Sequence, residues 1–348
     1  MEDELVQQVQ QAISRRVPLC VCGGNSKAFF GRACAGELLD VSGHRGIIAY
    51  EPTELVITAR AGTPLAEIEA ALAANNQMLS FEPPHFSSAA TLGGMVAAGL
   101  SGPRRPWGGS VRDAVLGVKL LNGRGEVLRL GGQVMKNVAG YDVSRLMVGA
   151  LGTLGVLLEV SIKVLPRPVC ERTLVFEPDA RVLPPLLPIS ASLEVDGKRY
   201  LRLSASFRCV ETAAELLGAE GVNPANPVYP ADPEIWNTVR EQTHPFFAGA
   251  APLWRVSLPA ATPSLDVPGP CLIEWGGALR WLRTDLPAAM LRQRVAALGG
   301  HATLFRGDHG AGDIFQPLPP ALLALHQRVK HALDPHGIFN PGRLYEGL

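Results

Sequence analysis

The fold is decided by a short stretch near the N-terminus, Val21-Cys22-Gly23-Gly24-Asn25-Ser26-Lys27. A strand that ends in two glycines and a small polar pair exposes successive backbone N–H groups, because no bulky side chain covers the main chain there. Such a nest of amides binds phosphate without the help of a positively charged side chain. The alternative interpretation of the same residues is an ordinary turn at the exit of a strand.

A second glycine pair follows in Thr91-Leu92-Gly93-Gly94-Met95-Val96-Ala97-Ala98-Gly99. Small residues let the main chain approach a pyrophosphate within hydrogen-bond distance, and Thr91 can cap a helix or donate a hydrogen bond. The alternative is a tightly packed helix of glycine and alanine. This stretch lies within residues 83–113, which are rich in Pro, Gly, Ser and Ala and show little periodicity. A loop of that length inside a compact domain is usually functional.

Two further motifs come later, Lys136-Asn137-Val138-Ala139-Gly140-Tyr141-Asp142 and Gly149-Ala150-Leu151-Gly152-Thr153-Leu154-Gly155-Val156. The glycines of the last motif have the spacing GxxGxxG, and they precede a predicted strand. A Rossmann dinucleotide fingerprint has the spacing GxGxxG and follows a strand. Spacing and order therefore both exclude a Rossmann site here.

The composition is typical of a globular protein with two lobes. The chain has 348 residues, of which 47% are hydrophobic and 18% charged, and this length exceeds the usual size of one hydrophobic core. Its 32 basic and 32 acidic residues balance, so no overall field attracts nucleic acid or an anionic membrane. Neither a signal-peptide pattern nor the ~20 apolar residues of a membrane helix is visible. We therefore expect a cytoplasmic protein.

The cysteines give no sign of a metal cluster. The six residues form no CxxC pair: Cys20, Cys22, Cys34, Cys170, Cys209 and Cys271. We expect them to be buried or half-buried thiols in a reducing cytosol. An iron–sulfur centre needs clustered thiolates, which this spacing does not provide.

Apolar periodicity and turn residues predict the elements. In the first lobe we expect a helix at 5–15 and a second helix that is capped by Thr63, has Pro64 in its first turn and is ended by Asn75-Asn76. We also expect a short helical segment at 143–148, strands at 19–21, 47–50, 55–60 and 78–81, and a strand pair or one long bent strand at 154–165. Asn122-Gly123 predicts a hairpin between strands 115–121 and 126–130. Pro166 and Pro168 mark the lobe boundary. For the second lobe we expect helices at 210–217, 234–243, 287–298 and 322–333, and strands at 192–195, 199–207, 253–258, 271–275 and 279–283.

Taken in order, the glycine motifs resemble the FAD-binding domain of the vanillyl-alcohol oxidase (PCMH-type) flavoprotein family. The resemblance runs from about Val17 to Val164, and Asp334-Pro335-His336-Gly337-Ile338-Phe339-Asn340-Pro341-Gly342 resembles the family's C-terminal signature. It implies an α+β fold, with a PCMH-type FAD-binding domain of two α+β subdomains at 1–168. A smaller α+β cap domain at 169–300 would follow, and a C-terminal segment at 301–348 would pack back near the flavin.

The resemblance also implies the residues that contact FAD. Gly108-Gly109-Ser110-Val111-Arg112-Asp113 is similar to the family's Gly-x-x-x-Asp stretch. The implied set is Gly23, Gly24, Asn25, Ser26, Thr91, Gly93, Gly94, Ser110, Gly140, Tyr141, Asp142, Gly152, Gly155 and Asn340. Some relatives bind FAD covalently through a His in the first glycine loop or a Cys after the second. Here those positions hold Asn25 and Met95-Val96, so we expect non-covalent FAD.

Within that family, the segment 136–142 and Trp275-Gly276-Gly277 resemble the E subunits of bacterial glycolate oxidases. This resemblance implies an FAD-binding subunit of a complex that oxidises glycolate and similar 2-hydroxy acids. The implied partners are a second FAD-containing subunit and an iron–sulfur subunit that takes the electrons, with any contact to the inner membrane made through them. Two alternatives stay open: a subunit that holds FAD for structure or electron relay, and a self-sufficient oxidase of a sugar or polyol.

Oxidation of a 2-hydroxy acid needs a cation for the carboxylate and a base for the hydroxyl proton. Arginine suits bidentate carboxylate binding. The candidates in the second lobe are the arginines Arg202, Arg280, Arg283 and Arg306, with His301 and His309 as bases; of these, Arg280, Arg306 and His309 form our set of catalytic candidates. The eight histidines form no HxxxH or HxH pair, so we expect no independent metal site.

Overall fold

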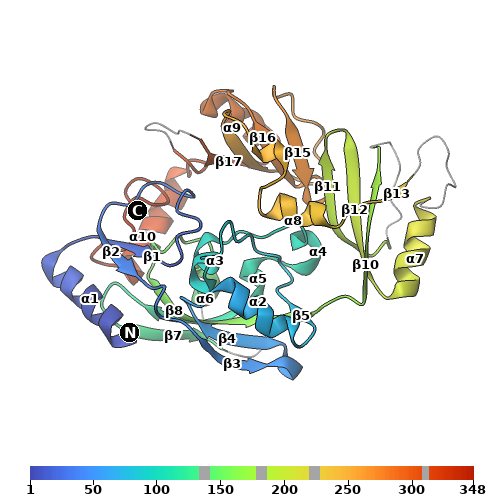
Figure 1. The fold of residues 1–348 in the computed structure, drawn as a ribbon. Coiled ribbons are helices and arrows are strands. Elements are labelled where there is room, and N and C mark those ends of the chain that lie inside the picture. Colours follow the sequence, from blue (N-terminus) through green and yellow to red (C-terminus); the bar gives the residue numbers. More distant parts are fainter. Residues whose placement is uncertain (133–141, 178–185, 219–227, 308–312) are drawn as a thin grey trace. The chain divides into compact units, whose positions relative to one another are not determined.

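The computed structural model describes residues 1–132, 142–177, 186–218, 228–307 and 313–348 (Figure 1). The chain divides into two compact units. Unit 1 contains residues 1–100, 110–166 and 311–348, and unit 2 contains residues 101–109 and 167–310. Both units mix helices with strands, which agrees with the α+β class that we expected.

Unit 1 is built on an antiparallel sheet with the strand order β3-β4-β8-β6-β7. Strands β8 and β6 are central and mostly apolar, so both of their faces are buried. A small parallel sheet pairs β1 with β2, and β5 pairs with β9. The strands are β1 (Leu19–Cys22), β2 (Glu37–Asp40), β3 (Ile47–Glu51), β4 (Val56–Arg60), β5 (Gln77–Met78), β6 (Val115–Leu121), β7 (Val127–Gly131), β8 (Val156–Lys163) and β9 (Leu165–Pro166).

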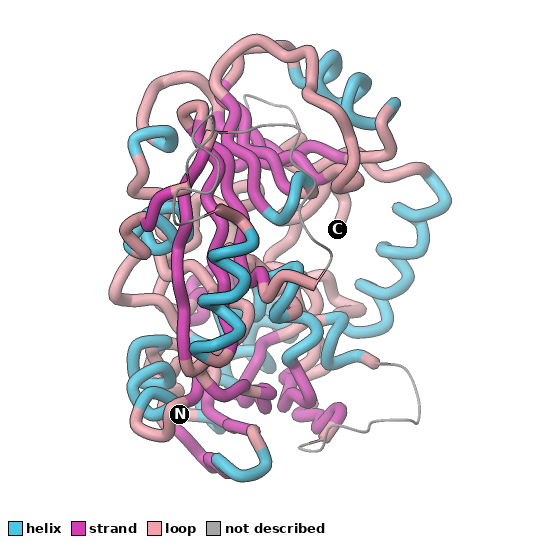
Figure 2. The backbone as a smooth tube through the Cα atoms, turned by 90° about the vertical axis from the view of Figure 1, so that its right-hand side faces the viewer, coloured by secondary structure: helices cyan, strands magenta, loops and turns pink. Residues whose placement is uncertain are grey.

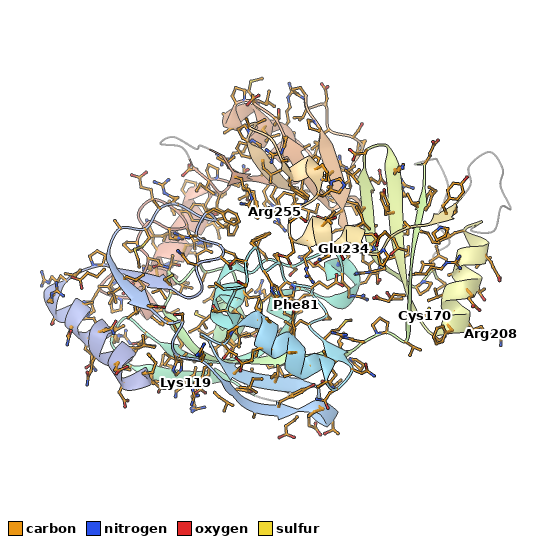
Figure 3. All side chains as sticks on the ribbon, in the orientation of Figure 1. Phe81, Lys119, Cys170, Arg208, Glu234 and Arg255 are labelled. Carbon is orange, nitrogen blue, oxygen red and sulfur yellow. A yellow bond between two sulfur atoms is a disulfide. The ribbon has the colours of Figure 1, made fainter. Side chains whose placement is uncertain are left out.

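The helices of unit 1 cover this sheet and close its core. Leu65, Ile68 and Leu72 share one face of α2 and are fully buried, as their spacing predicts. Phe81, labelled in Figure 3, is buried in the same core. The helices are α1 (Glu2–Arg15), η1 (Pro52–Glu54), α2 (Leu65–Ala73), α3 (Leu92–Ala98), α5 (Val111–Ala114), α6 (Val143–Leu146) and α10 (Pro320–Leu333).

The C-terminal segment returns to β1. The N–H of Leu19 donates to the carbonyl of Ile338 at 2.7 Å, and the N–H of Asn340 donates to the carbonyl of Leu19 at 2.9 Å. Buried Lys330 links this segment to the turn before β8, because its ammonium donates hydrogen bonds to the carbonyls of Phe339 and Thr153 at 2.7 Å each. The end of the chain therefore belongs to the same core as the first strand.

Unit 2 contains one antiparallel sheet with the order β13-β10-β12-β11-β15-β16-β14-β17. Figure 2 draws the strands of the protein in magenta. Its strands are β10 (Cys170–Phe176), β11 (Ile189–Val195), β12 (Lys198–Ala205), β13 (Tyr229–Pro230), β14 (Leu253–Ser257), β15 (Cys271–Glu274), β16 (Leu279–Arg283) and β17 (His301–Arg306). Its helices are α4 (Arg105–Gly108), α7 (Phe207–Leu216), α8 (Glu234–Arg240), η2 (Pro245–Phe247), η3 (Trp275–Gly277) and α9 (Ala288–Ala297).

The two faces of the unit 2 sheet differ in character. Helices α7 and α9 pack on one face and form two apolar clusters with it. The strand register places charged and aromatic side chains on the other face, among them Arg202, Arg255 and Trp281. The arginines on that face make it suitable for binding an anion.

The structure differs from the expected elements at several places. Thr63 does not cap α2: its hydroxyl accepts a hydrogen bond from Gly46 at 2.8 Å, and Pro64 occupies the cap position. In the long loop expected at 83–113, α3 is the Gly/Ala helix that was the alternative interpretation, whereas α4 and α5 were not expected. Strands β2, β10, β13 and β17 were missed, and only Met78 of the strand expected at 78–81 lies in a strand, the two-residue β5. Residues 301–306 pair with β14, and residues 101–109 belong to unit 2. The bounds of the two units therefore differ from the domain bounds that we expected.

Candidate flavin site

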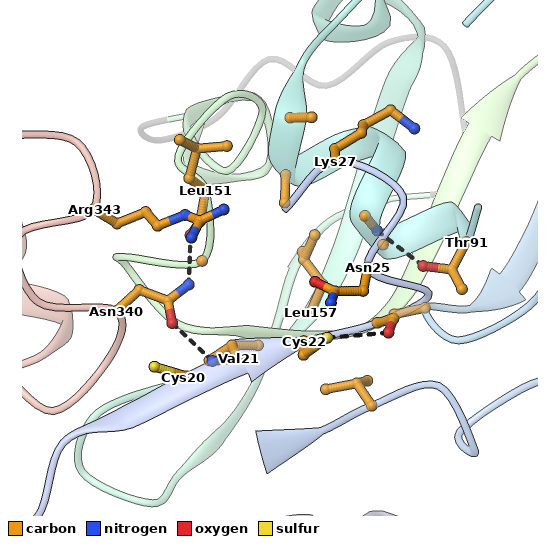
Figure 4. A pocket seen from close by; sticks show the side chains of 18 of the residues that line it. Cys20, Val21, Cys22, Asn25, Lys27, Thr91, Leu151, Leu157, Asn340 and Arg343 are labelled. Atoms are coloured by element: carbon orange, nitrogen blue, oxygen red, sulfur yellow. Dashed lines mark hydrogen bonds between the residues drawn. The ribbon is translucent and has the colours of Figure 1, made fainter. Parts of the chain in front are cut away.

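A pocket of about 290 Å³ lies in unit 1, where β1 ends (Figure 4). Four segments line it: the loop after β1, the start of α3, the turn before β8 and the C-terminal segment. Most of the expected FAD contacts meet here, namely Gly23, Gly24, Asn25, Ser26, Thr91, Gly93, Gly94, Gly152, Gly155 and Asn340. Segments more than 300 positions apart in the chain thus form one cavity.

The first glycine loop packs directly against Ala89 and Thr91, which precede the second glycine pair. A Cβ on Gly24 would stand 1.4 Å from the carbonyl oxygen of Ala89, and one on Gly23 would stand 2.7 Å from the hydroxyl of Thr91. Asn25 has a φ of 56°, a left-handed conformation that asparagine tolerates better than most residues. The loop therefore needs glycine for its own packing as well as for any ligand.

The two glycines at the start of α3 have different roles. Thr91 caps the helix by accepting a hydrogen bond from the N–H of Gly94 at 3.3 Å. A Cβ on Gly93 would meet the Cβ of Ala61 at 2.7 Å, whereas one on Gly94 would meet only the Thr91 hydroxyl, at 3.1 Å. Gly93 is thus required by packing on the end of β4. At Gly94, by contrast, the space that a Cβ would fill is part of the pocket.

Asn340 joins three walls of the pocket. Its side-chain oxygen accepts from the N–H of Val21 at 2.7 Å, and its side-chain amide donates to the carbonyl of Leu151 at 2.6 Å. Gly152 has a φ of 72°, and a Cβ there would lie 2.7 Å from the Asn340 amide nitrogen. Asn340 therefore lines the pocket chiefly as a cross-link.

Two cations in the pocket were absent from the expected set of FAD contacts. Arg343 donates to the carbonyls of Ala28 and Phe30 at 3.0 Å each, and burial lowers the pKa of its guanidinium. Lys27 donates to the Ser26 hydroxyl and to a backbone carbonyl, both at 3.3 Å. Lys27 belongs to the first glycine motif, residues 21–27, but no local sequence pattern signals Arg343.

Cys20 and Cys34 form a disulfide in the wall of this pocket, which corrects our expectation of six free thiols. The two residues are 14 positions apart, and their Cα atoms are 6.0 Å apart. Spacing in the sequence did not reveal the pair, because β1 and the loop after it come together only on folding. Cys22 remains a free thiol, and burial followed by the charge of Asp40 raises its pKa.

Two of the remaining expected FAD contacts, Ser110 and Asp142, lie outside this pocket. Ser110 and Asp113 form a capping box on α5, and Asp142 caps α6 by accepting from the N–H of Arg145 at 3.0 Å. Neither Ser110 nor Asp142 lines the pocket. Gly140 and Tyr141 lie outside the described residues. Contacts of these four residues with FAD stay predictions.

The catalytic candidates of unit 2 are mostly engaged within the protein. Arg280 donates to the carbonyls of Thr262, Pro263 and Gly277. Arg306 donates to Gln242 at 3.1 Å. The guanidinium of Arg283 reaches the carbonyls of Phe246, Phe247, Gly249 and Ala251.

The other candidates are placed as follows. Arg202 bonds to Ser190 and stands over Trp236. His301 lies on β17, and the pKa of its imidazole is lowered by partial desolvation and then by the charge of Arg255. His309 lies outside the described residues. Catalytic roles for all of these stay predictions.

The chemistry of the pocket fits an anionic dinucleotide. Its wall combines glycine-rich backbone with the two cations Lys27 and Arg343, and none of the described residues that line it is a carboxylate. Apolar side chains from Met147, Leu151 and Leu157 complete the wall. A pyrophosphate and a flat aromatic group need this combination of amides, positive charge and apolar surface.

Fold and pocket together define a flavoprotein of the oxidase class, and comparisons with known proteins agree. Residues 1–131 match the model of the FAD binding domain, and residues 289–344 match that of the C-terminal domain of FAD linked oxidases. The chain belongs to the FAD-linked oxidase family and has FAD as its cofactor.

Two curated relatives narrow this class. The chain is 51% identical over 353 residues to the glycolate oxidase subunit GlcE of Escherichia coli (strain K12), covering 99% of this chain and 97% of that protein. It is 32% identical over 177 residues to the glycolate oxidase subunit GlcD of Bacillus subtilis (strain 168), covering 49% of this chain and 37% of that protein.

Solved structures confirm the fold that the glycine motifs predicted. p-Cresol methylhydroxylase matches with a TM-score of 0.69 at 15% identity, covering 99% of this chain and 87% of that one. A 4-ethylphenol oxidase from Gulosibacter chungangensis matches with a TM-score of 0.68 at 13% identity, covering 100% and 88%. At these identities the likeness concerns the fold alone.

The described residues include neither a helix fit to span a membrane nor a side-chain cluster fit to hold a metal ion. No helix among them is both long and apolar enough to cross a membrane. Within the same residues, no group of three or more His, Cys, Asp or Glu side chains is placed to hold a metal ion.

Proposed function

We propose that this chain is the FAD-binding subunit of a glycolate oxidase complex that oxidises glycolate and similar 2-hydroxy acids. The observation that carries the proposal is the 51% identity to glycolate oxidase subunit GlcE over 99% of the chain. The pocket at the end of β1 supports it independently, because its glycines and cations suit a dinucleotide.

The residues of the pocket bind and orient the cofactor. The bound FAD supplies the group that accepts a hydride from the carbon bearing the hydroxyl. Lys27 and Arg343 offset the charge of the pyrophosphate, and the glycine loops provide backbone amides to it. Met147, Leu151 and Leu157 exclude water from one wall.

The residues at the two linkage positions support non-covalent binding. Asn25 occupies the position where some relatives carry a His, and its amide is not a nucleophile. Met95 is a residue of α3, and its side chain is buried in the core of unit 1. Acid precipitation tests this proposal: the yellow colour should pass into the supernatant, and colour retained in the pellet would show a covalent link.

The partners are proposed from the resemblance. A second FAD-containing subunit and an iron–sulfur subunit would complete the complex, and the iron–sulfur subunit would take the electrons. We place the complex in the cytoplasm, with any attachment to the inner membrane made through these partners.

An anaerobic absorbance spectrum tests the function. The protein purified alone should be yellow, and it should bleach when glycolate or D-lactate is added. The control is glycolamide, which has the hydroxyl but no carboxylate. Bleaching by glycolamide to the same extent would contradict oxidation of a 2-hydroxy acid.

A second function, electron relay or structural support, is favoured by the arginines of unit 2. Arg280 and Arg283 are both occupied by backbone carbonyls, so they offer little to a substrate. A yellow protein that stays yellow alone, yet bleaches when the partner subunits are added, would support this function. Turnover with oxygen by the isolated chain would instead support a self-sufficient oxidase.

A further inference from the structure

The motif Trp275-Gly276-Gly277 forms a strained turn after β15. Its φ angles are 57°, 64° and 101°. A bulky residue with positive φ is rare and persists only where its surroundings enforce it. Here a Cβ on Gly277 would stand 2.4 Å from the carbonyl oxygen of Ala260, so the third position must be glycine.

Two hydrogen bonds fix the indole ring that this turn presents. The ring N–H of Trp275 donates to the carbonyl of Gly102 at 3.0 Å, and the N–H of Gly276 donates to the hydroxyl of Ser192 at 2.7 Å. Trp275 is only 5% exposed. The turn therefore holds the ring in one orientation.

Two arginines stand over this one ring. The guanidinium carbon of Arg105 lies 4.5 Å from the ring centroid, and that of Arg255 lies 5.2 Å from it. Within the described residues, neither guanidinium makes a hydrogen bond or an ion pair. Stacking on an aromatic face leaves the N–H edges of a guanidinium available, and these edges match a carboxylate.

The charges of the pair are not balanced. Burial, and then the charge of Arg105, lowers the pKa of Arg255 to about 10. The carboxylate that opposes this effect belongs to Glu274, and it accepts a hydrogen bond from the indole of Trp281 at 2.7 Å. Two positive charges near one ring repel each other, and an anion between them would relieve the repulsion.

The register shows which face of the sheet carries the pair. Arg255 is paired with Trp281 and Thr303, so these side chains share a face. The neighbouring Trp254 and Val256 point to the opposite face, into the cluster with α9. Arg255, labelled in Figure 3, thus lies on the face away from α9.

We propose that Arg105, Arg255 and Trp275 form a binding site for a small carboxylate, which the proposed function identifies as the carboxylate of the 2-hydroxy acid. The two guanidinium edges hold the carboxylate oxygens, and Trp275 keeps both cations in place. The site is distinct from the arginines that the sequence suggested, because those are occupied by the protein itself. It assigns a substrate-positioning role to a motif that the flavin pocket does not use.

Calorimetric titration of the FAD-loaded protein tests this site by binding rather than by turnover. The probes are glycolate under anaerobic conditions and oxalate, with glycolamide as the uncharged comparison. Arg255→Gln and Arg105→Gln should each weaken binding of both acids by about tenfold or more, because each loses a charge-assisted hydrogen bond. Arg255→Lys, which keeps the charge but loses the fork, should give an intermediate affinity.

Arg292→Gln is the matched control. Its guanidinium stands 5.5 Å from the ring of Trp254, a similar pair that packs with α9 on the opposite face. Unchanged affinity in the Arg292 variant supports the proposal, and an equal loss in it would overturn it. If Arg255→Gln does not fold, as judged by circular dichroism, exposed Arg105 carries the test alone.

The outcomes separate this proposal from the function on which it rests. If the wild-type protein binds neither acid while its complex oxidises glycolate, the carboxylate site is refuted and the function stands. If the acids bind through Arg105 and Arg255 but no flavin is reduced, the site stands and the function fails. Loss of partner subunits in these variants, without loss of acid binding, would assign the pair to a partner's carboxylate and overturn the proposal.

Discussion

The side-chain oxygen of Asn340 accepts a hydrogen bond from the backbone N–H of Val21 at 2.7 Å, across 319 positions of the chain. The same amide donates to Leu151. One side chain therefore holds together β1, the turn before β8 and the C-terminal segment, beside the glycine loop that follows β1. The integrity of the pocket depends on the last residues of the chain, so binding of FAD and docking of that segment should be coupled.

Replacing Asn340 by Ala tests this coupling. The partly buried N–H of Val21 and the buried carbonyl of Leu151 would lose their partners, and the buried carbonyl left unpaired costs about 1–3 kcal/mol. We expect a lower melting temperature and a weaker affinity for FAD, measured by thermal unfolding with and without added FAD. The control is Asn75→Ala, at an exposed asparagine near the end of α2. Equal FAD affinity in the wild type and the Asn340 variant would refute the coupling.

The two glycine loops should respond differently to one added methyl group. Gly24→Ala places a Cβ 1.4 Å from a carbonyl oxygen, so the loop must move whether or not FAD is bound. Gly94→Ala meets only the Thr91 hydroxyl at 3.1 Å and should fold normally. We expect loss of both stability and flavin for Gly24→Ala, but loss of flavin affinity alone for Gly94→Ala. Melting temperatures of the flavin-free proteins and fluorescence titration with FAD measure the two effects separately.

The loops that line the pocket could be predicted because each contains a local glycine pattern of the kind that phosphate binding uses. Nine of the expected FAD contacts that line the pocket belong to such patterns, namely Gly23, Gly24, Asn25, Ser26, Thr91, Gly93, Gly94, Gly152 and Gly155. Arg343 was missed because its partners, Ala28 and Phe30, lie more than 300 positions away and only folding brings them near.

The arginines of unit 2 show the same limit. Arg255 and Arg280 both lie on strands of one sheet. The guanidinium of Arg280 donates hydrogen bonds to carbonyls, whereas that of Arg255 stacks on the ring of Trp275. Residue type and spacing cannot distinguish them. The pattern also gave most strands, but it missed β17, which is an edge strand defined by its pairing with β14.

Reduction of the disulfide should loosen the first phosphate loop. Cys20 and Cys34 enclose Gly23, Gly24, Asn25 and Ser26 within a closed segment of chain. A cross-link over 14 positions stabilises a protein by about 3 kcal/mol in the chain-entropy description. We expect Cys34→Ser to lower the urea midpoint and to weaken FAD binding, and a reductant to have the same effect on the wild type only. The control is Cys209→Ser, at an exposed free cysteine.

The pH dependence of unit 2 should depend on Glu171. Burial raises the pKa of this carboxyl, but Arg104, the Ser204 hydroxyl and Arg202 together outweigh burial, and the pKa falls below its ordinary value of 4.5. A carboxyl with a lowered pKa contributes stability that is present above the unfolded pKa and is lost as the pH falls through the folded one. Wild type should therefore be more stable than Glu171→Gln at neutral pH, and this difference should shrink once the pH drops below 4.5. Urea midpoints of both proteins between neutral and strongly acidic pH measure it. Glu215→Gln, an exposed position on α7, should follow the wild type throughout, and a difference for Glu171→Gln that does not vary with pH would rule out the ionic contribution.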